Sequence, residues 1–314
     1  MKKSSMKNYK IIYDNICTGL SKYVKENHMS TMILGISGGI DSTICAVICN
    51  EVSKQTGVKL IGVSLMCNTN KDNEVSIADE VGELFCDEYY KVNIEELYKT
   101  ISAMFSSYAP TFNNTSKIAE GNIKARLRMM YLWHLGGLRN GVVIDTDNLT
   151  EHYLGFWTLH GDSNYITPIG DLWKTEVYSL TSYIRKNCIS ILDNPMKERE
   201  HYFDWYEKVI AVLNKAIDII PTDGNGVSNS DLEQIGGKSY DEVDDILKSV
   251  VCGKFNTDEY VRVTNNYGVE TVNKVIKRYK NSEFKRKHLP LVIDPYTGEI
   301  CEDRIPDIDV VSVC

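Results

Sequence analysis

The sequence predicts an α/β protein: a doubly wound, Rossmann-like parallel sheet with helices on both faces and a helical C-terminal extension. Short apolar runs alternate with segments of helical periodicity between residues 32 and 144. Strands separated by helices pair in parallel, because the crossover helix returns the chain to the same edge. The chain of 314 residues suits one large domain, expected over residues 1–290, followed by a tail over 291–314.

The elements of the first half follow one another in the order that this fold needs. Residues 7–28 have the apolar periodicity of an amphipathic helix, and Met32–Ile36 is an apolar run typical of a buried strand. A helix follows from Ile40 to Ile48. The next predicted elements are a strand at Lys59–Leu65, a helix at Asp72–Phe85 and a strand at Tyr89–Val92.

The second half is mainly helical. A long helix is expected over Ile118–Leu138, followed by a strand at Gly141–Ile144, and helices are expected after Lys174. The turn-rich segment Pro221–Ser230 is typical of a loop that could act as a lid, and Asp294–Cys314 has no clear periodicity.

Composition narrows the class of function. The formal charge of −8 argues against a broad nucleic-acid-binding surface, and no run approaches the roughly 20 apolar residues that span a bilayer. The nine cysteines include no Cys-x-x-Cys pair, and no apolar signal segment follows Met1. We therefore expect a cytoplasmic protein that acts on small molecules, with neither a nucleic-acid nor a membrane partner.

The turn from Ser37 to Ser42 is the most informative segment. It lies between the predicted strand and helix, where backbone N–H groups point outward and the helix dipole favours an anion. Gly38 and Gly39 permit dihedral angles closed to other residues, and Ser37, Ser42 and Thr43 add hydroxyl groups. Because neither the Walker pattern nor Gly-x-Gly-x-x-Gly occurs here, γ-phosphate transfer and hydride chemistry are disfavoured.

A second polar turn, Asp145–Asn148, follows the strand at Gly141–Ile144. In parallel sheets, ligands collect at the carboxyl ends of the strands. Both turns meet that condition, so we expect them to face one crevice.

The turn resembles the Ser-Gly-Gly-x-Asp-Ser signature of the N-type ATP pyrophosphatases, which cleave ATP between the α and β phosphates. The segments Gly121–Met129, Thr146–Glu151 and Pro168–Thr175 resemble motifs of the ammonia-dependent NAD synthetases and occur in that family's order. Similar C-terminal segments follow, so the resemblance covers about residues 30–290.

The resemblance implies an ATP-dependent amide-forming ligase. Such an enzyme adenylates the carboxylate of deamido-NAD and then displaces AMP with ammonia to give NAD. It implies that Asp41 and Glu151 hold Mg²⁺ and that Asp41 and Lys174 are catalytic. The residues implied to bind ATP are Ser37, Gly38, Gly39, Asp41, Ser42, Thr43, Thr146, Lys174 and Thr222, and those implied to bind the acceptor are Arg126, Asp162 and Lys285.

The family also implies partners. Arg126 would reach the dinucleotide across the interface of a homodimer. Relatives that use glutamine carry an extra nitrilase-like domain, for which this chain has no room, so free ammonia or a separate glutaminase is implied.

The departures from the family lie at acceptor positions. Leu159 replaces a lysine, Phe284 replaces a histidine, the second aspartate of the loop after Asp162 is missing, and Leu232 replaces an acidic residue. A lost charged hydrogen bond is worth roughly 1.5–3 kcal/mol, so recognition of deamido-NAD should weaken unless His160 replaces the lysine. Two alternatives stay open: a related adenylating ligase for another carboxylate, and a nucleotide-binding sensor without turnover.

Overall fold

The sheet has four parallel strands, as expected. The computed structural model describes residues 7–108, 117–161, 165–193, 202–222, 226, 228–251, 256–286, 292–293 and 300–301. The strands are β1 (Thr31–Gly35), β2 (Lys59–Met66), β3 (Glu88–Asn93) and β4 (Gly141–Ile144), and they pair in the order β3-β2-β1-β4. Ile33 of β1 lies opposite Ile61 and Val143, at the centre of the sheet.

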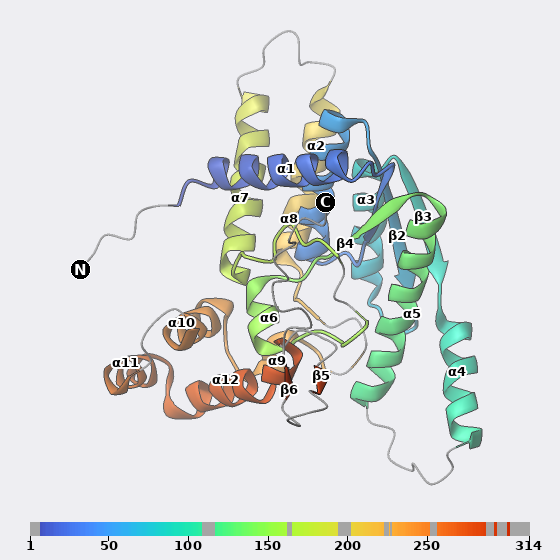
Figure 1. Ribbon diagram of the computed structural model, residues 1–314. Helices are drawn as coiled ribbons and strands as arrows, with labels where there is room; N and C mark the ends of the chain where they lie inside the picture. The colour runs from blue at the N-terminus through green and yellow to red at the C-terminus, as the bar shows by residue number, and fades with distance from the viewer. Residues whose placement is uncertain are drawn as a thin grey trace, which may run out of the picture.

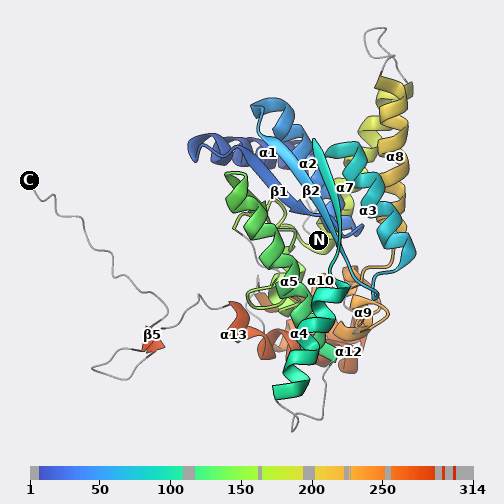
Figure 2. The same ribbon diagram turned by 90° about the vertical axis from the view of Figure 1, so that its right-hand side faces the viewer.

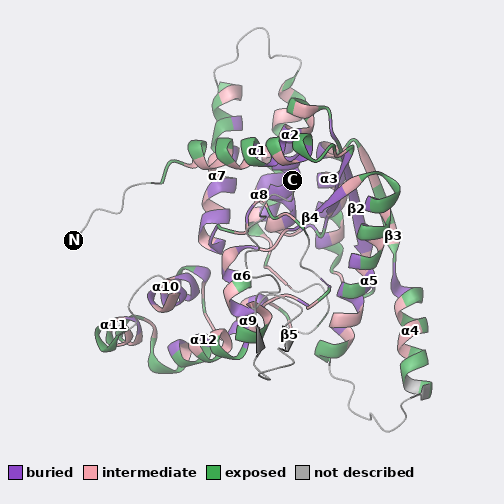
Figure 3. Cartoon of the chain, in the orientation of Figure 1, coloured by how far each residue is buried: buried purple, intermediate pink, exposed green. Residues whose placement is uncertain are grey.

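Helices cover both faces of the sheet (Figure 2), which confirms the doubly wound fold. Met32, Leu34 and Leu60 face one side, where they pack against α1 (Tyr9–Glu26), α2 (Ile40–Thr56), α3 (Asp72–Phe85), α7 (Lys174–Asp193) and α8 (Phe203–Asp218). Ile33 and Ile61 face the other side, towards α4 (Glu95–Tyr108) and α5 (Lys117–Leu138). Successive residues of each strand therefore serve opposite cores, and both cores exclude water (Figure 3).

The C-terminal helices have an apolar core of their own. They are α9 (Asp231–Ile235), α10 (Tyr240–Val251), α11 (Thr257–Tyr267), α12 (Val269–Asn281) and α13 (Glu283–Arg286). Helices α10, α12 and α13 contact α6 (Leu149–Leu154), and Figure 1 shows α11 on the outer side of α10 and α12. Val243, Ile246 and Leu247 lie at helical spacing and are fully buried, so α10 is amphipathic. Leu154 and Trp173 join this cluster, which connects it to the segments that follow β4. The predicted helical extension is confirmed.

Element boundaries differ from the prediction by one or two residues, except that the helix expected over Ile40–Ile48 continues to Thr56. The sequence analysis anticipated neither α4 nor α6. Tyr98 and Ile101 of α4 pack against the core, whereas its apolar side chains Leu97, Met104 and Phe105 are exposed. Of the expected tail, the structure describes only β5 (Val292–Ile293) and β6 (Ile300–Cys301), which pair antiparallel. The division into 1–290 and 291–314 stays a prediction.

Within the described part of the chain, no helix combines the length and apolar character that crossing a bilayer requires.

Candidate active site

The turn between β1 and α2 has the geometry of an anion-binding corner. Gly38 has φ +83°, and a Cβ there would come within 2.0 Å of the backbone oxygen of Glu74, so only glycine fits. Gly39 is the N-cap of α2 and has no side chain to cap the first N–H groups. The Oγ atoms of Ser37 and Ser42 lie 3.0 Å apart and are hydrogen bonded, which holds the turn closed.

Thr43 lies behind the turn. Its side chain is fully buried, and its hydroxyl donates to the backbone oxygen of Gly39 at 2.9 Å. Ser37, Gly39, Asp41 and Ser42 line the adjacent cavity, whereas Gly38 and Thr43 do not. Thr43 is therefore placed to stabilise the turn, not to meet a ligand directly.

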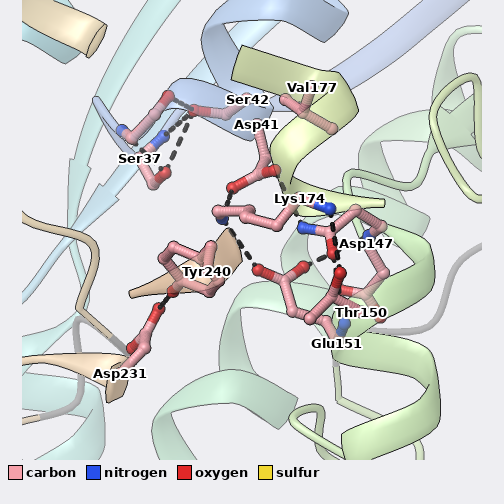
Figure 4. A network of polar contacts seen from close by, with 12 residues as sticks. Ser37, Asp41, Ser42, Asp147, Thr150, Glu151, Lys174, Val177, Asp231 and Tyr240 are labelled. Carbon is pink, nitrogen blue, oxygen red and sulfur yellow. Dashed lines mark hydrogen bonds and ion pairs between the residues drawn. The ribbon is translucent and has the colours of Figure 1, made fainter. Parts of the chain in front are cut away.

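Lys174 joins two carboxylates from distant segments (Figure 4). It is the first residue of α7, and its Nζ contacts Oδ2 of Asp41 and lies 3.0 Å from Oε1 of Glu151. The Lys174 side chain is 1% exposed, while Asp41 and Glu151 are 17% and 15% exposed. Asp41 and Glu151 lie in the first turns of α2 and α6, where the helix dipole favours negative charge. The carboxyl ends of β1 and β4 thus bring the two predicted turns together.

Asn148 orients both carboxylates, a role that the sequence analysis missed. As N-cap of α6 it forms a capping box with Glu151: its Oδ1 accepts from the backbone N of Glu151 at 3.1 Å, and Oε2 of Glu151 accepts from its backbone N at 3.2 Å. Its Nδ2 donates to Oδ1 of Asp41 at 3.0 Å. One oxygen of each acid is therefore held by the protein, and the other points towards Lys174. The spacing Asn148-x-x-Glu151 is that of a capping box and could have identified this role from the sequence.

The electrostatics of this group favour a further cation. Burial raises the pKa of Glu151 to about 7, although Lys174 lowers it, and the nearby Asp41 raises it further. Burial disfavours the charged form of Lys174, but attraction to Asp41 and Glu151 outweighs it and raises the pKa of the ammonium well above its usual value. With both acids ionised, one ammonium faces two carboxylates, and a further cation would relieve the excess negative charge that helps to raise the pKa of Glu151.

This donor set fits Mg²⁺ in combination with phosphate oxygens. Among the residues that the structure describes, no group of three or more His, Cys, Asp or Glu side chains could hold a metal by itself. Magnesium commonly takes one or two carboxylates and completes its shell with water and substrate phosphates. Asp41 and Glu151 direct one oxygen each towards a shared position beside the anion-binding turn, as such a site requires.

These groups line a cavity of about 400 Å³. Apolar residues of β2 and α5 line it, including Val63, Leu65, Met129 and Leu132. Thr146 also lines it, as does Thr222, whose Oγ1 donates to Oε1 of the buried Glu74 at 2.5 Å. Two cations, Lys285 and Arg278, line it together with residues 155–158.

The residues predicted to bind the acceptor are only partly brought together. Lys285 lines the cavity, and its Nζ donates to the backbone oxygens of Trp157 and, at 2.7 Å, of Gly155. Arg126 is exposed on α5 and does not line the cavity; its Nε donates to the backbone oxygen of Leu159 at 3.3 Å. Asp162 lies outside the described residues.

Two residues weighed for acceptor recognition lie at the surface: Phe284, where the chain departs from the family, and His160, which could replace the lost lysine. Phe284 is 57% exposed and does not line this cavity. His160 is exposed and adopts φ +58°, a left-handed conformation that is uncommon outside glycine. Neither side chain lies where Lys174 and its carboxylates meet.

Arg278 was not anticipated. Its guanidinium packs over the ring of Phe156, with 4.9 Å from Cζ to the ring centre, and its Nε donates to the backbone oxygen of Leu154 at 3.3 Å. Burial lowers its pKa, and Asp231 opposes that effect. Arginine on an amphipathic helix is common, so no pattern in the sequence distinguished Arg278 from its exposed neighbours.

One family of known proteins matches nearly the whole of this chain. The family model described as NAD synthase matches residues 12–289. The NH3-dependent NAD(+) synthetase of Methanocaldococcus jannaschii is 31% identical over 276 residues, which are 88% of this chain and 93% of the relative. That of Archaeoglobus fulgidus is 27% identical over 287 residues, which are 90% of this chain and 97% of the relative.

Solved structures share the fold. The NMN synthetase of Francisella tularensis has a TM-score of 0.69 at 24% identity, with 92% of this chain and 99% of that chain covered. The NH3-dependent NAD synthetase of Campylobacter jejuni has a TM-score of 0.64 at 22% identity, with 92% and 100% covered. At these identities the likeness establishes the fold alone.

Proposed function

This chain belongs to the NAD synthase family, and from that membership we infer that it is an ATP-dependent ligase that forms NAD by amidation of deamido-NAD with ammonia. Neither another acceptor nor a sensor without turnover gains support from these relatives. The site residues, the metal and the oligomeric state are the parts that we propose from the geometry.

One observation supports assigning the reaction to the cavity. Asp41, Glu151 and Lys174 come from three separate segments, yet they meet beside the phosphate-type turn. A site that cleaves ATP between the α and β phosphates needs anion-binding N–H groups, a cation and metal-holding carboxylates at one place.

In the first step, the carboxylate of deamido-NAD attacks the α-phosphorus of ATP. The bond from that phosphorus to the bridging oxygen breaks, and pyrophosphate leaves with the electron pair. The turn at residues 37–42 would bind the phosphates, and Lys174 would contact them as their charge develops. Mg²⁺, which Asp41 and Glu151 would hold, supplies positive charge to neutralise the pyrophosphate.

In the second step, the nitrogen lone pair of ammonia attacks the acyl carbon. AMP leaves with the electrons of the C–O bond, and a proton passes to solvent. Neither step needs a protein nucleophile, so positioning carries the catalysis. The cations Arg278 and Lys285 line the cavity and contact residues 155–157, and we assign that part of the cavity to the anionic acceptor.

We also propose a homodimer. On α5, Arg126, Met130 and Trp133 lie at spacings of four and three residues and so share one face. Met130 and Trp133 are 56% and 43% exposed, which is unusual for large apolar side chains unless a partner covers them. A second copy on this face would allow Arg126 to reach a ligand. Met130→Lys should then shift the sedimentation coefficient from that of a dimer to that of a monomer.

We further propose a cytoplasmic location and an external source of ammonia. Six cysteines are free thiols, as a reducing compartment favours: Cys17, Cys45, Cys49, Cys67, Cys86 and Cys188. Ammonium, or ammonia released by a separate glutaminase, would supply the nitrogen.

The decisive experiment measures pyrophosphate and NAD with ATP, Mg²⁺ and ammonium, and compares deamido-NAD with other carboxylates, including nicotinate mononucleotide. We expect stoichiometric NAD and pyrophosphate from deamido-NAD, and faster turnover of another acid would contradict the proposal. Ser37→Ala should weaken ATP use, whereas Lys215→Met, at an exposed ion pair with Glu80, serves as a matched surface control.

A further inference from the structure

Asp244, on α10, is a buried acid whose partners adjoin the proposed catalytic residues. It is 1% exposed and accepts hydrogen bonds from Oγ1 of Thr150 at 2.6 Å, Oγ1 of Thr175 at 2.7 Å and the backbone N of Thr175 at 3.0 Å. Thr150 directly precedes Glu151, and Thr175 directly follows Lys174. One carboxylate is therefore hydrogen bonded to the N-terminal turns of both α6 and α7.

The connection continues to the backbone of Lys174. Its backbone N donates to Oγ1 of Thr150 at 2.8 Å, so the Thr150 hydroxyl accepts from α7 while it donates to Asp244. The first N–H groups of a helix have no acceptor within the helix, and here they find one on Asp244 and one on Thr150. The arrangement fixes how far apart α6 and α7 begin.

Asp244 does not touch the reacting groups. Asp244, Thr150 and Thr175 are absent from the lining of the cavity that Asp41, Glu151 and Lys174 share. The hydrogen bonds of Asp244 lead to Glu151 and Lys174 through the two threonines.

We infer that Asp244 is a positioning residue of the ligase: through Thr150 and Thr175 it sets the separation of Glu151 and Lys174. The inference rests on the proposed function of the cavity. Misplacement of a reacting group by about 1 Å can cost 10²-fold in rate, and loss of these hydrogen bonds frees both helix termini.

The Asp244→Asn variant should lose stability as well as activity. Burial raises the pKa of Asp244, although its hydrogen bonds with Thr150 and Thr175 lower it. Three donors point at the two oxygens of Asp244, and an asparagine amide offers one acceptor oxygen, so buried donors lose their partner in the variant. The rates are therefore compared at a temperature at which the variant is folded.

The test compares Asp244→Asn with Asp245→Asn. Asp245 is the next residue on α10, but it pairs with Arg262 at 2.7 Å and Tyr267 at 2.9 Å, outside the cavity. With ATP, Mg²⁺, ammonium and deamido-NAD, we expect kcat to fall at least tenfold in Asp244→Asn, KM for ATP to change less than threefold, and Asp245→Asn to stay within twofold of wild type.

The threonines provide conservative and disruptive replacements at the same positions. Thr175→Val removes the hydroxyl but keeps the shape, so its kcat should fall, whereas Thr175→Ser should stay within threefold of wild type. Asp244→Asn combined with Thr175→Val should be no slower than the slower single variant, because both break one connection. If the double variant instead loses the product of the two single losses in kcat, the inference is overturned. The comparison of Thr175→Val with Thr175→Ser decides the question even if Asp244→Asn does not fold.

The outcomes separate the two proposals. If wild type forms NAD and folded Asp244→Asn is equally fast, the inference fails and the proposed function stands. If wild type forms no NAD, the proposed function fails, and a double-mutant cycle on the melting temperature then tests Asp244. The loss caused by Lys174→Met should be smaller in the Asp244→Asn background than in wild type, because the ion pair of Lys174 with Glu151 is already misplaced there. Equal losses in both backgrounds would overturn the positioning role.

Discussion

Replacing Lys174 by methionine removes the cation between two buried carboxylates while it keeps the length of the side chain. Asp41 and Glu151 would then face each other uncompensated, each less than one fifth exposed. Breaking a buried ion pair on one side typically costs about 3–5 kcal/mol, because the remaining charge stays desolvated.

The expected loss can be measured as a melting temperature in EDTA. With an unfolding entropy of roughly 2 cal/mol/K per residue, a chain of 314 residues loses about 5–8 °C for that cost. The control is Lys215→Met, which opens an ion pair with Glu80 whose side chains are 50% and 35% exposed. An exposed pair contributes about 0–1 kcal/mol, so this control should melt within about 2 °C of wild type.

Magnesium should reverse the effect selectively. Binding to the folded state at a hundred times Kd stabilises by about 2.7 kcal/mol, or roughly 4 °C here. In wild type the ammonium of Lys174 already lies between Asp41 and Glu151, where the metal would bind. In Lys174→Met no ammonium competes with the metal for that position. Without ATP, Mg²⁺ should therefore raise the melting temperature of the variant more than that of wild type.

Two results would refute this reasoning. Melting of Lys174→Met within 1 °C of wild type in EDTA would mean that the two carboxylates do not depend on the ammonium. Equal stabilisation of both proteins by Mg²⁺ would mean that the metal binds elsewhere.

The remaining predictions concern turnover. Asp41→Asn and Glu151→Gln should each fold but form pyrophosphate at least tenfold more slowly at saturating ATP; near-normal rates in both would remove the metal assignment. The pure protein, assayed with either nitrogen source, should form NAD with ammonium and little NAD with glutamine. Leu159→Lys should lower KM for deamido-NAD with little change in kcat, unless KM is already low in wild type. Arg278→Gln should raise that KM at least tenfold, because a guanidinium that lines the cavity is lost, while the exposed Lys277→Gln should leave it unchanged.

Much of the site was predictable from the sequence, because the phosphate-type turn and the strands that carry it are each formed by residues close together in the chain. The two glycines of the turn were read as a requirement for unusual backbone conformation, and Gly38 indeed adopts φ +83° against the backbone of Glu74. The family resemblance then picked out Asp41, Glu151 and Lys174. Their meeting in one crevice followed from the rule that the carboxyl ends of parallel strands share one edge.

Other roles needed the structure. Arg278 and Arg126 look alike in sequence, since both are arginines on helices, yet one lines the cavity and the other lies exposed on α5. Phe284, expected to stand at a substrate contact, is 57% exposed outside the cavity. The departure at Phe284 therefore says less about the acceptor than its sequence position suggested.

The sequence by itself determined the parallel sheet, the helices on both faces and the phosphate-type turn, because apolar periodicity and glycine placement act within a few residues. Only the tertiary structure decided which side chains became partners. Lys174 meets Asp41 across 133 residues of chain, and Asp244 meets Thr150 across 94. The first pair depends on how α7 packs against α2, and the second on how α10 packs against α6, and no local pattern records that packing.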